Sequence, residues 1–337
     1  MKRTPTIKRR NRKPLRTVIT VLLVTVAIIV AAIAVLSVYM TEDFTRTEVS
    51  DEDFGIAEED RGPGGVISFF KKPDIMNIVF LGIDEEENRS DVIMILSFNK
   101  GENTLKLISL LRDSKVAIEG CEYETKIGYA YKWGGSAFAV RTINRNFNTN
   151  FNQFITMDFE GIAGIVDSLG GVEVELLAEE AQKVNEGSAK LGYEGYDAVE
   201  GLNVLNGPQA VAFSRIRSAI ENDGEHIRVS RQQTVIEGML AKIRTIPKYR
   251  YPSIIRRTLN CLETTLTYSD MIYLASMDVQ NLKMTKYTIP DEEFETDLVG
   301  GWEQNPDWEW NEYQWVWIYD LKAASERLKS IIYEEQE

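Results

Sequence analysis

Arginines are concentrated in one short stretch of this chain, and their spacing suits a phosphate ligand. Within seventeen residues stand Arg215, Arg217, Arg228 and Arg231. Arg215 and Arg217 would share one side of an extended segment. Arg228, Arg231 and Gln232 would share one face near the start of a helix. Guanidinium groups pair with phosphate oxygens and a helix start adds free N–H groups, so the pattern predicts a diphosphate site. A solvated basic face is the alternative, but it would place Lys as readily as Arg.

Two further segments place ionisable residues at the ends of apolar runs. Asp84 and Asp91 flank a turn between two expected strands, where two carboxylates can converge on one Mg²⁺ ion. An acidic surface turn is the alternative interpretation. Arg112 follows a third expected strand, where it could bind an anion or form only a structural ion pair with Asp113.

An alternation of strands and helices would position these residues. Apolar runs bounded by turn residues predict strands over 76–82, 92–98, 104–111, 153–157, 172–174 and 283–289. Helical spacing predicts helices over 158–169, from 206 onward, and over 227–243, 253–266, 269–277 and 320–333. Asp158 is expected to cap the first of these helices, and Gly170 and Gly171 to end it. The order predicts an α/β fold with a mixed central sheet covered by helices on both faces.

The amino-terminal forty residues predict a membrane anchor. Eight Lys or Arg residues lie in the first sixteen positions, and no charge follows until residue 42. As a helix, the apolar block would be about 31 Å long, enough to span a bilayer, whereas the apolar part of a cleaved signal peptide is shorter. Since the positive flank stays inside, we expect a cytoplasmic tail over 1–16 and a transmembrane helix over 17–40. An extracellular linker over 41–74 and a catalytic domain over 75–335 would follow.

Charge and composition exclude several functions. Eight of the 38 Lys and Arg residues lie in the tail, which leaves 30 against 52 Asp and Glu residues in the rest of the chain. Such a surface repels nucleic acid, so any phosphate site must be a local concentration of arginine. The single histidine, His226, excludes a His-based metal site and a serine triad, and we expect it at the surface of a helix end. Cys121 and Cys261 could form a disulfide or remain separate thiols.

Six segments, in order, resemble the motifs of the LytR-CpsA-Psr family, and the resemblance as a whole covers roughly Asn77 to Tyr333. They are residues 77–84 (NIVFLGID) with 89–94 (RSDVIM), 108–114 (ISLLRDS), 167–172 (DSLGGV), 205–210 (LNGPQA), 213–217 (FSRIR) and 228–233 (RVSRQQ). Six ordered matches are far more specific than any one of them.

The resemblance implies an α/β/α fold that holds the lipid tail of a polyprenyl-pyrophosphate glycan in a hydrophobic pocket, with the diphosphate at its mouth beside Mg²⁺. It implies that Asp84 and Asp91 hold the metal and that Arg89 stands close to the reacting phosphate. The implied diphosphate ligands are Arg112, Arg215, Arg217, Arg228 and Gln232, with Arg231 in a supporting place. The implied reaction is attack by a peptidoglycan hydroxyl on the glycan phosphate. The chain would then be a Mg²⁺-dependent phosphotransferase that attaches teichoic acid, capsule or another wall glycan.

Two departures from the family pattern leave alternatives open. The turn before Asp91 is short and acidic (residues 85–88, EEEN), which bears on the metal site and on the acceptor mouth. Glu225 stands where the family usually shows Asp and Gly close to the arginine, so Glu225, or alternatively Asp223, is the expected general base. A hydrolase of the same lipid-linked glycans, or a non-catalytic protein that binds them, therefore stays an alternative.

Overall fold

The computed structural model describes residues 46–56, 74–195, 197–217, 224–247, 250–251, 254, 261–291, 298–304 and 313–333. The expected basic tail and transmembrane helix, residues 1–40, lie outside this part of the chain. Among the described helices, none is both long and apolar enough to cross a membrane.

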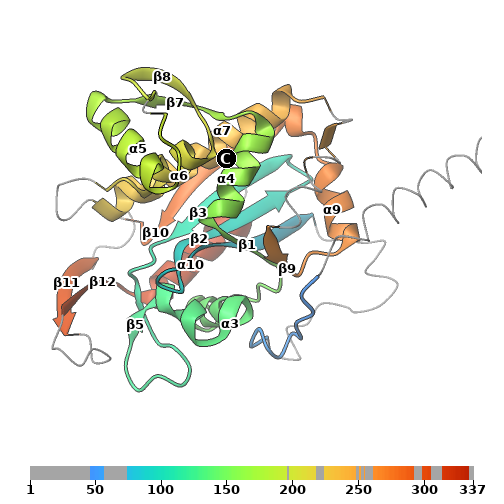
Figure 1. The fold of residues 1–337 in the computed structure, drawn as a ribbon. Coiled ribbons are helices and arrows are strands. Elements are labelled where there is room, and N and C mark those ends of the chain that lie inside the picture. The colour runs from blue at the N-terminus through green and yellow to red at the C-terminus, as the bar shows by residue number, and fades with distance from the viewer. Residues whose placement is uncertain are drawn as a thin grey trace, which may run out of the picture. The chain divides into compact units, whose positions relative to one another are not determined.

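A six-stranded mixed sheet forms the centre of the domain (Figure 1). Its strands are β1 (Ile75–Asp84), β2 (Arg89–Asn99), β3 (Thr104–Leu110), β6 (Phe154–Asp158), β9 (Leu262–Thr264) and β10 (Lys283–Ile289). The order across the sheet is β10-β3-β2-β1-β6-β9. The pairs β1–β6 and β3–β10 are parallel and the other pairs are antiparallel. The predicted mixed α/β sheet is therefore confirmed.

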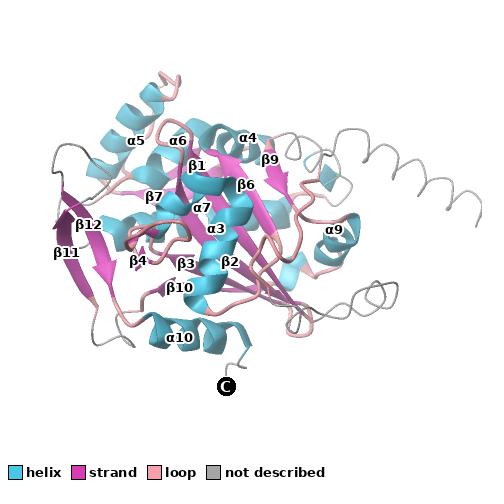
Figure 2. Ribbon diagram, turned by 90° about the horizontal axis from the view of Figure 1, so that it is seen from below, coloured by secondary structure: helices cyan, strands magenta, loops and turns pink. Residues whose placement is uncertain are grey.

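One face of the sheet carries the main hydrophobic core. Because side chains alternate along a strand, Val79, Leu81 and Ile83 of β1 all point to this face. Two helices cover it, α3 (Ala130–Phe147) and α10 (Leu321–Tyr333), and Figure 2 shows α3 in front of the strands. Phe54 is also buried in this core and its carbonyl accepts a hydrogen bond from Asn144. Residues 46–56, part of the expected linker, thus pack against the domain.

The opposite face of the sheet is covered by α4 (Phe159–Leu169), α7 (Gly224–Thr245) and α9 (Tyr268–Ala275). The even-numbered residues of β1 and β2, among them Phe80, Leu96 and Phe98, point to this side. Asp158 caps α4 by accepting a hydrogen bond from Gly161 N at 2.6 Å, and Gly170 ends the helix in the left-handed conformation. Helices therefore lie on both faces, as predicted.

A smaller layer packs beside α4 and α7 around its own hydrophobic cluster. It consists of the hairpin β7 (Val172–Leu176) and β8 (Gly201–Leu205) with α5 (Ala178–Lys190) and α6 (Gly207–Arg215). The predicted strand over 172–174 exists but pairs only with β8, outside the central sheet. Short elements complete the described fold: β4 (Lys115–Val116), β5 (Thr125–Lys126), η2 (Ile127–Tyr129), η4 (Val279–Asn281), β11 (Val299–Gln304) and β12 (Tyr313–Ile318).

Several features differ from the sequence-based expectation, and α5, β8, β11 and β12 are among the elements that were not predicted. The helix expected over 253–266 is wrong at its end, because Leu262–Thr264 pair with β6 as β9. Helix α3 was not predicted, since Gly134 and Gly135 interrupt its helical backbone and its pattern. Cys121 and Cys261 form no disulfide with each other, so the two separate thiols are the alternative that the structure shows.

Candidate functional site

A β-bulge shapes the end of the β1–β2 hairpin, where both expected metal ligands stand. Gly82 pairs with Val92, but the next residue, Ile83, pairs with Ser90. Asp91 is therefore the extra residue of the bulge. A bulge bends the strand and turns a side chain out of the regular alternation, which is common beside functional sites.

Asp91 lies at the centre of a buried ionic cluster. Its Oδ1 accepts a hydrogen bond from Arg89 Nε at 3.1 Å and is in direct contact with Arg112 Nη1. Burial alone would raise the pKa of Asp91, but the guanidinium groups of Arg112, Arg228 and Arg89 outweigh it and hold this pKa below its usual range. Asp91 is therefore an anion at neutral pH, as a metal ligand must be.

Arg112 is buried, and both its backbone and its side chain have fixed partners. It is 6% exposed, and its carbonyl accepts a hydrogen bond from Gly128 N at 2.9 Å. A Cβ at Gly128 would lie 2.9 Å from Ser90 O, so glycine permits this close approach. Asp113 lies 3.7 Å from Arg112 Nε and 2.9 Å from Lys126 Nζ. Lys126 was not predicted as part of the site, because only the pairing of β4 with β5 brings it here.

The first turn of α7 brings the expected base to the same cluster. Glu225 is in direct contact with Arg228 Nη2 and lies 4.0 Å from Arg112 Nε. Burial raises the pKa of Glu225 above its usual range and Asp113 adds to this, while Arg228, Arg112 and Arg217 act in the opposite direction. A buried carboxyl with a raised pKa suits a general base. Asp223, the alternative base, lies outside the described residues.

Arg228 and Gln232 occupy successive turns of one face of α7. Both are more than nine-tenths buried. Arg228 Nε and Nη1 have no hydrogen-bond partner among the described residues, and burial together with Arg112 and Arg217 lowers the pKa of Arg228 to about 10 despite Glu225. Buried N–H groups without acceptors cost about 1–3 kcal/mol each. A bound anion would supply these acceptors.

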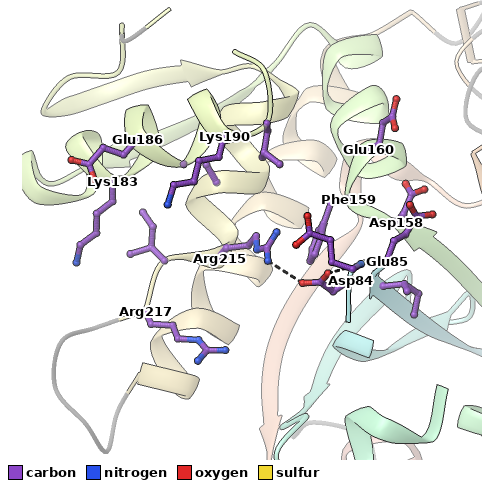
Figure 3. A pocket seen from close by; sticks show the side chains of 16 residues that line it. Asp84, Glu85, Asp158, Phe159, Glu160, Lys183, Glu186, Lys190, Arg215 and Arg217 are labelled. Atoms are coloured by element: carbon purple, nitrogen blue, oxygen red, sulfur yellow. Dashed lines mark hydrogen bonds and ion pairs between the residues drawn. The ribbon is translucent and has the colours of Figure 1, made fainter. Parts of the chain in front are cut away.

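Arg215 comes to the site at the end of α6. Asn206 and Gln209 cap the start of α6, and Gly207 N donates to Asp167 of α4 at 2.7 Å. At the other end, Arg215 Nη2 lies 3.0 Å from Asp84 Oδ2, and its guanidinium lies over the Phe159 ring (Figure 3). The expected extended conformation of Arg215 is wrong, since it is the last helical residue.

Arg217 follows Arg215 and lines the same cleft (Figure 3). The side chain of Arg217 is exposed. Arg231, by contrast, points away from the cluster: its guanidinium donates to Glu180 of α5 and to the carbonyl of Ile216. Through its hydrogen bond to Ile216, Arg231 fixes the segment that leads to Arg217.

The expected site residues line two cavities. The first is a polar cleft of about 880 Å³ between α5, α6 and the β1–β2 turn. One wall is acidic, and the other is mainly basic but also carries Glu186, as the side chains of Figure 3 show. The acidic wall contains Asp84, Glu85, Glu86, Asp158 and Glu160, and the basic wall Lys183, Lys190, Arg215 and Arg217. The second cavity, of about 380 Å³, is almost wholly apolar and lies between the sheet, α4, α7 and α9.

Helix α7 links the ionic cluster to the apolar cavity. Gln232 lines that cavity, and Ile236, Met239 and Ile243 continue the lining along the same helix. Arg228 lies one turn before Gln232 on this face. A ligand with a charged head and a long apolar tail therefore matches the surface that α7 presents.

The structure brings most of the expected site residues together. Asp91, Arg89, Arg112, Glu225 and Arg228 form the cluster, and Asp84, Arg215 and Arg217 form its neighbouring cleft. His226 is half-buried against Trp317, with ring centroids 5.6 Å apart, and is not the surface residue that we expected.

The chain combines a mixed sheet with an arginine-rich cluster beside an apolar cavity, and comparison with known proteins identifies its family. The model of the LytR_cpsA_psr family matches residues 37–321, so this chain belongs to the LytR-CpsA-Psr family. A teichoic acid transferase TagU of Bacillus anthracis is 29% identical over 250 residues, 73% of this chain and 77% of the relative. TagU of Enterococcus faecalis is 29% identical over 206 residues, 59% of this chain, and the match spans only 64% of that relative's length.

Solved structures with 19–22% identity share the fold. Bacillus subtilis TagV superposes with a TM-score of 0.59 at 19% identity, over 79% of this chain and all of that chain. TagT bound to LI-WTA gives 0.57 at 22% identity, over 77% and 89%. YwtF (TagT) with bound octaprenyl pyrophosphate lipid gives 0.55 at 21% identity, over 77% and 90%.

Proposed function

We propose that this protein transfers a glycan polymer from a polyprenyl-pyrophosphate carrier to peptidoglycan. The observation that carries the proposal is the face of α7, on which Arg228 and Gln232 lead directly into the lining of the apolar cavity. Such a surface accommodates both the diphosphate and the lipid chain of one carrier. The relatives named teichoic acid transferases, and a similar fold with bound octaprenyl pyrophosphate, support the same substrate class.

The arginines would stabilise the charge that develops during transfer. Arg112, Arg215, Arg217 and Arg228 are the proposed diphosphate ligands, with Gln232 at the entrance to the lipid cavity. Arg89 stands beside Asp91, close to the phosphate that reacts. Guanidinium groups that are already in position need little reorganisation to stabilise phosphate charge, so positioning and charge neutralisation would provide most of the rate acceleration.

Glu225 is the proposed general base. The acceptor hydroxyl would give its proton to the Glu225 carboxylate while its oxygen forms a bond to the glycan-linked phosphorus. The bond from that phosphorus to the bridging oxygen of the diphosphate would break, and the lipid monophosphate would leave. The acceptor then carries the glycan through a phosphodiester.

Asp84 and Asp91 are the proposed ligands of a Mg²⁺ ion. Two carboxylates are what Mg²⁺ usually takes from a protein, the other ligands being phosphate oxygens and water. The donors fit in number and charge: Asp91 is an anion, and its Oδ2 accepts no hydrogen bond within the described residues. In those residues there is no cluster of three or more possible metal ligands, so the diphosphate would have to complete the set. When bound, Mg²⁺ would neutralise phosphate charge.

We also propose that residues 17–40 anchor the protein in the cell membrane as a single-pass helix, with the amino terminus in the cytoplasm and the catalytic domain outside. The basic tail and the uncharged stretch of the sequence support this. The anchor would hold the site near the membrane that contains the lipid carrier.

A hydrolase would use the same residues, with water in place of the acceptor hydroxyl. The test is to incubate the full chain with a labelled polyprenyl-pyrophosphate glycan and a peptidoglycan oligomer, with Mg²⁺ or EDTA, beside the Arg217→Ala variant. Label on peptidoglycan that requires both Mg²⁺ and Arg217 is the expected result. Label released only into solution would establish the hydrolase, and intact carrier would contradict both.

A further inference from the structure

The hairpin β11–β12 carries an aromatic stripe that the proposed chemistry does not use. In its register, Trp302 pairs with Trp315, Gln304 with Tyr313 and Gly300 with Trp317. Directly paired residues share a face of a hairpin, and so do residues two apart on one strand. Trp302, Tyr313, Trp315 and Trp317, which we call the aromatic stripe, therefore lie on one face.

The rings of three members of the stripe, Trp302, Trp315 and Trp317, are in contact and continue to the start of α7. Ring centroids of Trp302 and Trp315 are 5.8 Å apart, and those of Trp315 and Trp317 are 5.7 Å apart. Trp317 then meets His226 at 5.6 Å. Gly300 makes room for this packing, since a Cβ there would lie 2.2 Å from the Trp315 ring. His226 follows Glu225 in the chain, so the stripe ends beside the turn of α7 that carries the proposed base.

Exposure increases along the stripe away from the site. Trp317 is 7% exposed, whereas Trp302 is 66% and Tyr313 is 63% exposed. The hairpin itself is fixed to the domain: Val316 and Gln314 are buried on the other face, and Lys115 Nζ lies 2.7 Å from Glu303. Two large aromatic side chains are thus held in water on a rigid support, which is typical of an interaction surface.

We propose that the aromatic stripe binds the neutral glycan strand of the acceptor and guides a sugar hydroxyl toward Glu225. The inference rests on the proposed function. Flat aromatic faces pack well against the C–H faces of pyranose rings, while Tyr313 and the tryptophan N–H groups can reach sugar hydroxyls. The four residues of the stripe carry no charge, so the stripe offers no cation to pair with an anionic polymer. A neutral strand therefore fits it better than an anionic one.

The position of the stripe favours the acceptor over the donor. Among the described residues, none of the hairpin lines the polar cleft beside Arg215 and Arg217, so donor and acceptor glycans would reach the start of α7 from different sides. A membrane surface is the competing partner for exposed Trp and Tyr residues. It would not account for the continuity of the stripe with His226.

The test is direct binding of a neutral sugar polymer to the full chain in detergent. The probe is a soluble hexamer of β-1,4-linked N-acetylglucosamine, and calorimetry gives the dissociation constant. We expect Trp302→Ala and Tyr313→Ala each to weaken binding at least tenfold. Trp133→Ala, at an exposed tryptophan of α3, and Val299→Ala, on the opposite face of the hairpin, should change it less than twofold.

Two further measurements separate the possible failures. Arg228→Ala should leave hexamer binding unchanged while it abolishes transfer. In the original protein, hexamer binding without any transfer would count against the proposed function and not against the stripe. In transfer assays, Trp302→Ala should raise the KM for polymeric acceptor and leave kcat unchanged. Unchanged hexamer binding by Trp302→Ala would overturn the proposal, and a loss of binding to phosphatidylcholine vesicles instead would assign the stripe to the membrane.

Discussion

Arg215 Nη2 lies 3.0 Å from Asp84 Oδ2, so the end of α6 is joined to the end of β1 inside the polar cleft. A proposed phosphate ligand and a proposed metal ligand thus hold each other in position. When substrate and metal bind, Arg215 could exchange Asp84 for a phosphate group, and Asp84 could exchange Arg215 for Mg²⁺.

Replacing Arg215 with Ala should reduce transfer much more than stability. Arg215 is 44% exposed, so its ion pair with Asp84 contributes no more than about 1 kcal/mol. We expect at least a hundredfold lower kcat/KM with a nearly unchanged thermal transition. Calorimetry and the transfer assay on one preparation check this. An equal loss of folding and activity would show that Arg215 is mainly structural.

Arg228 and Arg231 lie one turn apart on α7 and form a matched pair. Arg228→Ala should abolish binding of inorganic pyrophosphate, because it removes the buried N–H groups that have no acceptor among the described residues. Arg231→Ala should retain measurable binding but lower the free energy of unfolding by about 1–3 kcal/mol, since it removes hydrogen bonds to Glu180 and Ile216. Titration calorimetry and chemical denaturation measure the two effects. Loss of pyrophosphate binding in Arg231→Ala but not in Arg228→Ala would contradict the role of Arg228 as a phosphate ligand.

The pH dependence of transfer should report Glu225. Its pKa is raised, mainly by burial, so the ionised base is lost as pH falls through this raised value. The acidic limb of kcat/KM should therefore lie above the ordinary pKa of glutamate. For stability the sign is opposite: the proton is held more tightly in the folded chain, so this contribution declines as pH rises through the folded-state pKa. Glu225→Gln should remove most activity, and an active variant with the same acidic limb would exclude Glu225 as the base.

Metal binding should require both carboxylates and a diphosphate. Titration with Mn²⁺, followed by electron paramagnetic resonance, should show tight binding only when pyrophosphate is present. Asp84→Asn and Asp91→Asn should each weaken it at least tenfold, whereas Glu86→Gln, in the same acidic turn, serves as the control. Tight binding to Asp91→Asn would place the ion elsewhere.

The apolar cavity should admit the lipid tail. Met239→Trp would fill part of it, so binding of a long-chain polyprenyl pyrophosphate should weaken at least tenfold. Inorganic pyrophosphate should bind as before, and Met239→Leu, which keeps the volume nearly constant, should behave like the original protein. Equal affinity of the Met239→Trp variant for the lipid would contradict this location.

The sequence predicted the central strands well because they are apolar runs bounded by turn residues, as in β1 and β2. It also placed Asp158 as a helix cap correctly. It did not predict α3, because Gly134 and Gly135 break the helical pattern. It also did not predict that Lys126 contacts Asp113 in the cluster, because the two residues are brought together only by the fold. The roles of Arg228 and Arg231 differ for the same reason, since their spacing gives a helical face but not the partner that each side chain meets.

The products of the reaction test the central claim most directly. Phosphorus NMR on the full chain, incubated with a polyprenyl-pyrophosphate glycan and peptidoglycan oligomer, distinguishes phosphodiester from phosphate monoester. We predict equal amounts of lipid monophosphate and a new phosphodiester that joins glycan to peptidoglycan. Lipid monophosphate accompanied by free glycan phosphate, with no phosphodiester on the acceptor, would contradict transfer.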